Sequence, residues 1–205
     1  MARSRDTRKR ILDAAQEAVL AKGFDATSIE EIVAASGVTR SGFFYHFPDK
    51  TALARALLER YVAEETDILT GIFDRARALH DDPLAAFLIG LKLLAELMAD
   101  LPNGHPGCLV AAACYQDRLF DAEVQALNRR AALEWRALIL ARLEPVAERY
   151  PPRDGVEMTE LADMILTTIE GGIVMAKALR DPQLLARQIL LQRSYVKLLF
   201  TPAAA

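Results

Sequence analysis

The chain is poor in cysteine and has no long uncharged segment. Cys108 and Cys114 are its only cysteines, too few for a disulfide framework. No uncharged run reaches the length of a membrane-spanning helix, about 18 residues. The first ten residues are polar and basic and no apolar segment follows them, unlike a secretory signal. We therefore expect a cytoplasmic protein with no membrane-spanning helix.

Recognisable catalytic signatures are also missing. The only histidines, His46, His80 and His105, lack the spacing to a glutamate or a second histidine that forms metal sites on helices. The sequence contains neither a glycine-rich phosphate loop nor the Gly-x-Ser-x-Gly elbow of hydrolases. We expect no enzyme activity, no cofactor and no metal. A helical enzyme of unrecognised chemistry is the alternative.

The chain has 10 glycines and 9 prolines among 205 residues, and 52% of its residues are hydrophobic. Glycine and proline fall mostly between segments with helical periodicity, which predicts an all-α fold. We expect a small N-terminal domain over residues 1–49 and a larger helical domain over residues 50–205. The surplus of apolar residues suggests that part of the larger domain is buried against a second subunit.

A helical hairpin is predicted between residues 28 and 48. Ser28 and Glu31 have the spacing of a capping box at the start of a first helix, and Gly37 provides the left-handed residue that ends it. Thr39 can cap a second helix, which Pro48 stops. Two short helices joined by a tight turn are the outline of a helix-turn-helix, whose second helix enters the DNA major groove.

The hairpin composition agrees with a polyanionic partner. Residues 32–48 contain no Asp or Glu, although the chain has 28, so nothing there repels phosphates. Basic residues between Arg3 and Arg10 add attraction. Lys50 would lie in the first turn of the next helix, where the dipole disfavours a cation unless an anion is bound. From spacing alone, an ordinary helical hairpin with a solvated basic tail explains these features equally well.

The hairpin also resembles a known family. It contains Ser28-Ile29-Glu30-Glu31-Ile32, then Ala35-Ser36-Gly37-Val38, and finally Phe44-Tyr45-His46-Phe47-Pro48-Asp49-Lys50. These segments resemble the DNA-binding signature of the TetR family of one-component transcriptional regulators. The resemblance is close over residues 1–50 and extends beyond them only in helical layout and length. It implies a homodimeric regulator in which the helix after residue 50 links effector binding to the DNA-reading heads.

We assign contacts with double-stranded DNA on this basis. Arg40 is the candidate for base reading. The other predicted residues lie beside it or contact phosphates. The predicted DNA-binding residues are Ser28, Thr39, Arg40, Ser41, Tyr45, His46 and Lys50. A two-fold symmetric protein predicts a palindromic operator with half-sites about one helical turn apart or more. The regulator is expected to be a repressor that a small molecule releases, and activation is an alternative that the sequence does not separate.

The middle helices of the larger domain are expected to hold the effector, because pockets in helical bundles are mostly apolar with a few polar groups. Simple core packing is the competing explanation for each candidate. An uncharged or weakly polar effector is expected. The candidates are Phe73, Phe87, Leu91, Met98, Cys108, Tyr115, Trp135, Ile139, Met164 and Thr168.

The last two helices are expected over residues 156–180 and 182–200. Gly171 and Gly172 interrupt the first, at a cost of about 1 kcal/mol each relative to alanine, so a close neighbour is expected there. That neighbour is either the last helix of the same chain or a second copy in a four-helix contact. The predicted dimer interface contains Ile165, Ile169, Gly172, Ile173, Ala176, Leu185, Ile189 and Val196.

Cys108 carries a separate hypothesis. It follows Gly107 at a predicted helix start, where the dipole can make a thiol reactive, and some regulators of this family sense electrophiles. The alternatives are a regulator switched by modification of Cys108 and a cysteine that is a small buried hydrophobe. A helical adaptor that binds only protein is a further rival for the whole chain, and it would show no salt-dependent binding to duplex DNA.

Overall fold

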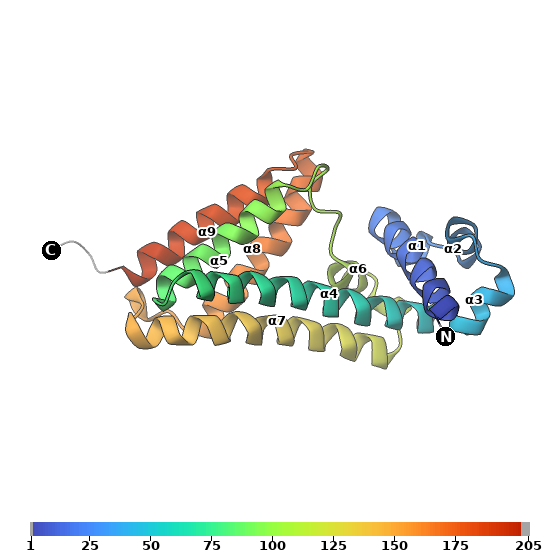
Figure 1. Ribbon diagram of the computed structural model, residues 1–205, viewed down its shortest axis with the longest axis horizontal. Coiled ribbons are helices and arrows are strands. Elements are labelled where there is room, and N and C mark those ends of the chain that lie inside the picture. The colour runs from blue at the N-terminus through green and yellow to red at the C-terminus, as the bar shows by residue number, and fades with distance from the viewer. Residues whose placement is uncertain (1, 202–205) are drawn as a thin grey trace. The chain divides into compact units, whose positions relative to one another are not determined.

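The computed structural model describes the backbone of residues 2–201 and the side chains of residues 4–201, and it contains no strand within that range (Figure 1). The all-α prediction is confirmed. The helices are α1 (Ala2–Ala26), α2 (Ile29–Ser36), α3 (Arg40–His46), α4 (Lys50–Leu79), α5 (Pro83–Ala99), α6 (Leu109–Tyr115), α7 (Ala122–Arg149), α8 (Met158–Leu179) and α9 (Leu184–Phe200). Two 3-10 turns are η1 (Asp117–Leu119) and η2 (Arg153–Gly155).

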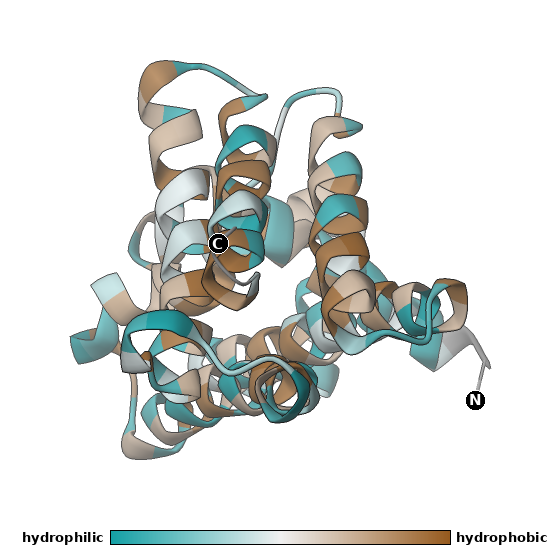
Figure 2. Ribbon diagram, turned by 90° about the vertical axis from the view of Figure 1, so that its left-hand side faces the viewer, coloured by the Kyte–Doolittle hydropathy of each residue, from teal (hydrophilic) through white to brown (hydrophobic). Residues whose placement is uncertain are grey.

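Apolar and polar residues recur along the helices, so that each helix has a face for the core and a face for its surroundings (Figure 2). Helix starts follow the sequence closely. Asp82 and Asp121 each accept a backbone N–H of the following helix at 2.9 Å, the arrangement of an N-cap. No helix in the described range is both long enough and apolar enough to cross a membrane.

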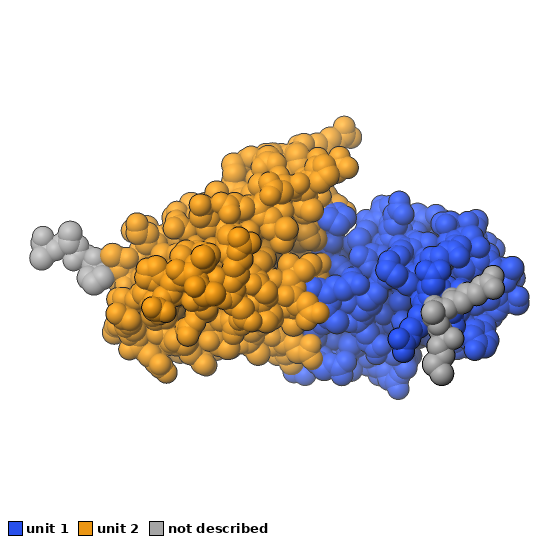
Figure 3. Space-filling model, in the orientation of Figure 1, with its two compact units in different colours: residues 1–64, 106–132 blue, residues 65–105, 133–205 orange. Residues whose placement is uncertain are grey.

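The chain divides into two compact units, coloured separately in Figure 3. Unit 1 contains residues up to 64 together with 106–132, and unit 2 contains residues 65–105 and 133 onward. The division therefore falls inside α4 and inside α7 rather than at residue 50. Residues 106–132, which we expected in the larger domain, belong to the N-terminal unit.

Unit 1 is built on α1, which packs against α2, α3 and α6. The core side chains of α1 point inward at helical spacing, with Ile11 and Ala15 fully buried. Gly23 breaks the helix with a φ of 86° and a ψ of 167°. Phe24 then folds back and meets Phe120 edge to face at 4.9 Å. This aromatic contact joins the end of α1 to the segment after α6.

In unit 2, α9 lies along both α5 and α8. A Cβ atom on Gly172 would stand 2.7 Å from Cδ1 of Leu185, whereas one on Gly171 would meet nothing within 4 Å. The close neighbour predicted for the glycine pair is therefore α9 of the same chain, and only Gly172 needs it. Pro182 lies in the turn before α9, whose first helical residue is Leu184.

Most residues predicted for the dimer interface pack inside the single chain. Ile169 is half-buried, and the others are buried inside the single chain, so they have almost no surface to offer a second copy: Ile165, Gly172, Ile173, Ala176, Leu185, Ile189 and Val196. The apolar side chains that α8 and α9 leave exposed are Val174, Met175, Leu179, Leu190, Leu191, Tyr195 and Leu198. We call these exposed residues the α8–α9 stripe.

Candidate nucleic-acid interface and ligand pocket

The start of α2 is fixed by one half of the predicted capping box. The Ser28 hydroxyl accepts the N–H of Glu31 at 3.2 Å. The Glu31 carboxylate does not complete the box, because Lys22 Nζ binds it at 2.5 Å. This ammonium group lowers the pKa of Glu31 below its ordinary value. Ser28 thus orients α2, and its hydroxyl is already engaged.

The turn between α2 and α3 is braced by a residue that we did not assign from the sequence. Gly37 takes the left-handed conformation with a φ of 63° and ψ of 28°. A Cβ atom there would lie 2.9 Å from Nη2 of Arg10, and that nitrogen donates a hydrogen bond to the carbonyl of Ser36. Arg10, a residue of α1, therefore stabilises the turn between α2 and α3. Its place in the basic N-terminal cluster was the only signal in the sequence.

Helix α3 buries one face and exposes the other. Thr39 caps it by accepting the N–H of Gly42 at 3.1 Å. Phe43 and, just after the helix, Phe47 are 0% and 2% exposed and anchor it in unit 1. On the other face Tyr45 is 80% exposed, next to exposed Arg40 and Ser41 on the same helix. Burial of the phenylalanines holds this polar face outward.

Arg40 has a carboxylate neighbour from the preceding helix. Its Nη1 lies 3.2 Å from Oε1 of Glu30, and both side chains are about two-thirds exposed. The guanidinium also stands 5.7 Å from the ring centre of Phe44. An exposed ion pair of this kind contributes at most about 1 kcal/mol. Bases or phosphates can therefore take the place of Glu30 at little cost.

The other predicted contact residues lie near the end of α3. His46 is half-buried, and its ring meets that of Tyr45 edge to face at 5.1 Å. Asp49 caps α4 by accepting the N–H of Ala52 at 2.7 Å. Lys50 Nζ donates a weak hydrogen bond, 3.4 Å long, to the carbonyl of Asp25. This carbonyl offsets in part the unfavourable place of Lys50 in the first turn of α4.

The basic N-terminal cluster is partly occupied by contacts within unit 1. Arg8 lies over the ring of Phe47, 5.4 Å from its centre, and Lys9 pairs with Asp13 at 2.7 Å. Arg5 is exposed at the surface of α1. The side chain of Arg3 lies outside the described residues. The cluster supplies positive charge beside α3, but Arg8 and Arg10 also support the hairpin itself.

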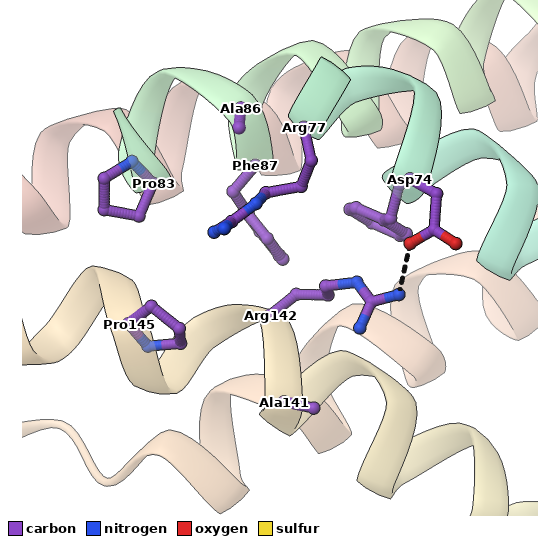
Figure 4. A pocket seen from close by; sticks show the side chains of 9 residues that line it. Asp74, Arg77, Pro83, Ala86, Phe87, Ala141, Arg142 and Pro145 are labelled. Carbon is purple, nitrogen blue, oxygen red and sulfur yellow. Dashed lines mark hydrogen bonds and ion pairs between the residues drawn. The ribbon is translucent and has the colours of Figure 1, made fainter. Parts of the chain in front are cut away.

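Unit 2 contains a cavity of about 500 Å³ between α4, α5 and α7, which we call the α4–α5–α7 pocket. Figure 4 shows its lining, with Phe87 and Arg77 directed toward α7. Phe73 and Phe87 stack at 5.3 Å between ring centres. The lining residues are Phe73, Asp74, Arg77, Pro83, Ala86, Phe87, Ala141, Arg142 and Pro145.

Two of the predicted pocket residues, Phe73 and Phe87, line this cavity. Leu91 and Ile139 are buried core residues, and Met98, Met164 and Thr168 are half-buried elsewhere in unit 2. Trp135 is half-buried and donates its indole N–H to Thr66 at 3.1 Å. Tyr115 does not line this cavity, and its side chain is 78% exposed in unit 1. The charged members of the lining were not found from the sequence.

Cys108 is a buried cap of α6. It is 9% exposed, and its sulfur accepts the N–H of Ala111 at 3.4 Å. Cys114 is exposed, and the side-chain amide of Asn128 donates to its sulfur at 3.0 Å. Within the described part of the chain, no group of three or more His, Cys, Asp or Glu side chains could hold a metal ion.

A sequence profile described as "Bacterial regulatory proteins, tetR family" matches residues 11–57, which include α2, α3 and the start of α4. The HTH-type transcriptional repressor BepR of Brucella suis is 32% identical over 81 residues, 38% of this chain and 39% of BepR. An HTH-type transcriptional regulator encoded in the lacX 3′ region of Lactococcus lactis is 24% identical over 198 residues, 94% of this chain and 95% of that protein.

The fold is shared with solved structures over nearly the whole chain. A transcriptional regulator of the TetR family from Agrobacterium tumefaciens superimposes with a TM-score of 0.79 and 19% identity, covering 97% of this chain and all of that one. The alignment with BepR spans only about two fifths of that protein. The profile match covers the predicted DNA-reading hairpin, and the similarity in fold extends through unit 2.

Proposed function

The chain belongs to the TetR family of DNA-binding transcriptional regulators, and from this premise we propose that it is a homodimeric repressor that a small molecule releases from a palindromic operator. The observation that carries the proposal is the outward face of α3. Thr39 caps α3, and Phe43 packs its inner face into unit 1. Arg40 and Tyr45 extend from the opposite side of the helix.

In the proposed complex α3 enters the major groove. Arg40 leaves Glu30 and donates to a base edge, for which guanine is the usual partner. Ser41 and Tyr45 lie on the same exposed face and bind phosphates or base edges beside it. Lys50 and His46 add phosphate contacts at the end of the hairpin. The predicted role of Ser28 is limited to presenting the start of α2, since its hydroxyl caps the helix.

The second copy is proposed to cover the α8–α9 stripe. Leu191 and Leu198 are 64% and 65% exposed and lie two helical turns apart on α9. Val174 and Met175 provide exposed apolar surface on α8. Large apolar side chains gathered on two neighbouring helices favour association with another subunit. The isologous contact of a two-fold dimer would bring the same stripe together from both copies.

The effector is proposed to bind unit 2. Helix α4 supplies Leu57 to the core of unit 1 and Phe73 to the α4–α5–α7 pocket. A ligand that shifts α4 at Phe73 would thereby act on a helix that unit 1 also uses. The buried position of Cys108 favours reversible ligand binding over covalent modification of that thiol. If a mild electrophile alkylates Cys108 and DNA affinity falls, the thiol-switch alternative is correct.

The experiment that tests the proposal is selection of bound fragments from sheared genomic DNA of the source organism. The expected result is enrichment of one palindromic sequence, with binding that weakens as salt rises. A reporter driven by a promoter that contains the palindrome distinguishes repression from activation. Absence of salt-dependent duplex binding would instead support a protein-only adaptor. Conversion of a bound small molecule would support an enzyme.

A further inference from the structure

The α4–α5–α7 pocket has an apolar floor that contains two stacked phenylalanines. Phe73 and Phe87 are each 2% exposed, and their rings stack with 26° between the planes. Pro83 and Pro145 contribute rigid apolar groups at one end (Figure 4). A volume of about 500 Å³ is within the usual range of small-molecule sites. The chemistry of this floor suits an apolar, aromatic ligand body.

The charged groups around the floor do not cancel. The lining contains Arg77 and Arg142 against the single carboxylate of Asp74, which leaves one positive charge. Asp74 Oδ1 binds Nη2 of Arg142 at 2.8 Å. This pair holds the Arg142 guanidinium at the pocket wall, as the dashed line in Figure 4 shows. Arg77 has neither an ion pair nor a hydrogen bond with any residue in the described range.

Arg142 also keeps an unused donor. Its Nε is buried, and no hydrogen-bond acceptor lies within reach among the described residues. A guanidinium group offers N–H donors in a fixed planar arrangement that matches a carboxylate. Burial of a donor without an acceptor is unfavourable. A ligand oxygen placed beside Arg142 would recover that cost.

From these groups we propose that the α4–α5–α7 pocket binds a monoanionic aromatic or similarly flat apolar carboxylate. The ring lies on Phe73 and Phe87, and the carboxylate is bound by Arg77 and by the free donor of Arg142. Asp74 positions Arg142 and disfavours a second negative charge. This assignment replaces the uncharged effector expected from the sequence. It rests on the proposed function only in treating the occupant as the effector; the binding site itself does not depend on DNA.

Isothermal titration of the full-length protein without DNA tests the site, with 2-naphthoate and its neutral counterpart 2-naphthamide as probes. The carboxylate is expected to bind saturably and at least about tenfold more tightly than the amide, since a charge-assisted pair with arginine contributes on the order of 1.4 kcal/mol or more. Equal affinity for the two probes, or no saturable binding of 2-naphthoate in the millimolar range, would overturn the proposal.

Matched variants then locate the binding groups. Arg77→Gln and Arg142→Gln are each expected to weaken 2-naphthoate about tenfold and to leave 2-naphthamide unchanged. Arg75→Gln is the control, because Arg75 is an exposed arginine of the same helix that does not line the pocket. If Arg75→Gln weakens binding as much as Arg77→Gln does, only general charge attraction is present and the assigned site is wrong.

The effect of the two probes on operator affinity distinguishes the pocket proposal from the proposed role of the pocket as the effector site. Naphthoate that binds through Arg77 and also lowers operator affinity supports both. Naphthoate that binds through Arg77 without any change in operator affinity supports the pocket and contradicts its role as the effector site. Release of the operator by 2-naphthamide as readily as by 2-naphthoate would contradict the carboxylate assignment while leaving the repressor proposal standing.

Discussion

Replacing Gly90 with alanine tests how closely Phe73 approaches α5. A Cβ atom at position 90 would lie 2.5 Å from Cδ1 and 2.6 Å from Cε1 of Phe73, distances that real carbon atoms do not adopt. The Phe73 ring is 2% exposed and stacks on Phe87, so it has little free space to move. The matched control is Gly71→Ala, because Gly71 is an exposed glycine of α4 whose Cβ would meet nothing within 4 Å.

Both substitutions change a helical glycine to alanine and should gain about 1 kcal/mol of helix propensity. At Gly71 this gain should appear in full as an increase in the free energy of unfolding. At Gly90 the forced shift of Phe73 costs about 1–3 kcal/mol, the usual range for overpacking a core. The gain in propensity is common to the two variants. Their difference in stability therefore measures the steric cost alone, about 1–3 kcal/mol in favour of Gly71→Ala.

Urea unfolding at one fixed protein concentration is the assay, since the apparent stability of a dimer depends on concentration. With a slope of about 1–3 kcal/mol per molar urea, the predicted difference separates the two midpoints by several tenths molar or more. Gly90→Ala should also weaken the binding of naphthoate, because the displaced Phe73 ring lines the pocket. A Gly90→Ala protein as stable as Gly71→Ala would show that Phe73 does not occupy the space beside Gly90.

Three further predictions concern the dimer, the end of α1 and the half-buried His105. Leu191 lies in the α8–α9 stripe, and Leu191→Glu should give a monomer in analytical ultracentrifugation. The control Leu79→Glu changes a similarly exposed leucine of α4 and should stay dimeric. A dimeric Leu191→Glu protein would contradict the proposed interface. The side-chain oxygen of Gln116 accepts the N–H groups of Phe24 and Asp25 at 2.9 and 3.3 Å. Gln116→Ala should therefore lower the free energy of unfolding by about 1–2 kcal/mol, whereas Gln116→Glu should keep most of the stability. Unchanged urea midpoints in both variants would refute the contact. Burial, followed by the charge of Lys177, lowers the pKa of His105 from 6.5 to about 4; the unfolded chain therefore binds the proton first, and stability should fall by up to about 3 kcal/mol as pH drops from 6.5 to 4. His105→Asn should reduce that loss in urea unfolding at each pH, and an unchanged pH profile would contradict it.

Local features of the fold were predictable from the sequence because they depend on neighbouring residues. Ser28 and Thr39 cap the helices that their spacing indicates. Gly37 has the left-handed conformation that ends α2. Pro48 ends α3 within two residues, as the restriction before a proline predicts. In each case the hydrogen-bond or packing partner lies in the same helix or in the next one.

Features that depend on distant segments were not predictable. Gly172 indicated a close neighbour, but a pattern in one helix cannot tell α9 of the same chain from a second copy. Residues 32–48 contain no acidic side chain, but Glu30 lies just outside this range. Its carboxylate reaches Arg40 from the preceding helix. Apolar periodicity marked Phe73 and Phe87, whereas Arg77 and Arg142 looked like ordinary solvated residues until α4 and α7 were seen to line one pocket.

The role of α3 is tested most directly by measuring the affinity of the Arg40→Ala protein for the selected operator with each base pair replaced in turn. The expected result is a loss of about 1–3 kcal/mol on the intact operator, with discrimination lost at a single base pair in each half-site. Lys50→Ala should instead weaken every duplex alike and reduce the salt dependence by about one phosphate contact. Equal discrimination by Arg40→Ala and the unmodified protein at every base pair would contradict the reading of DNA by α3.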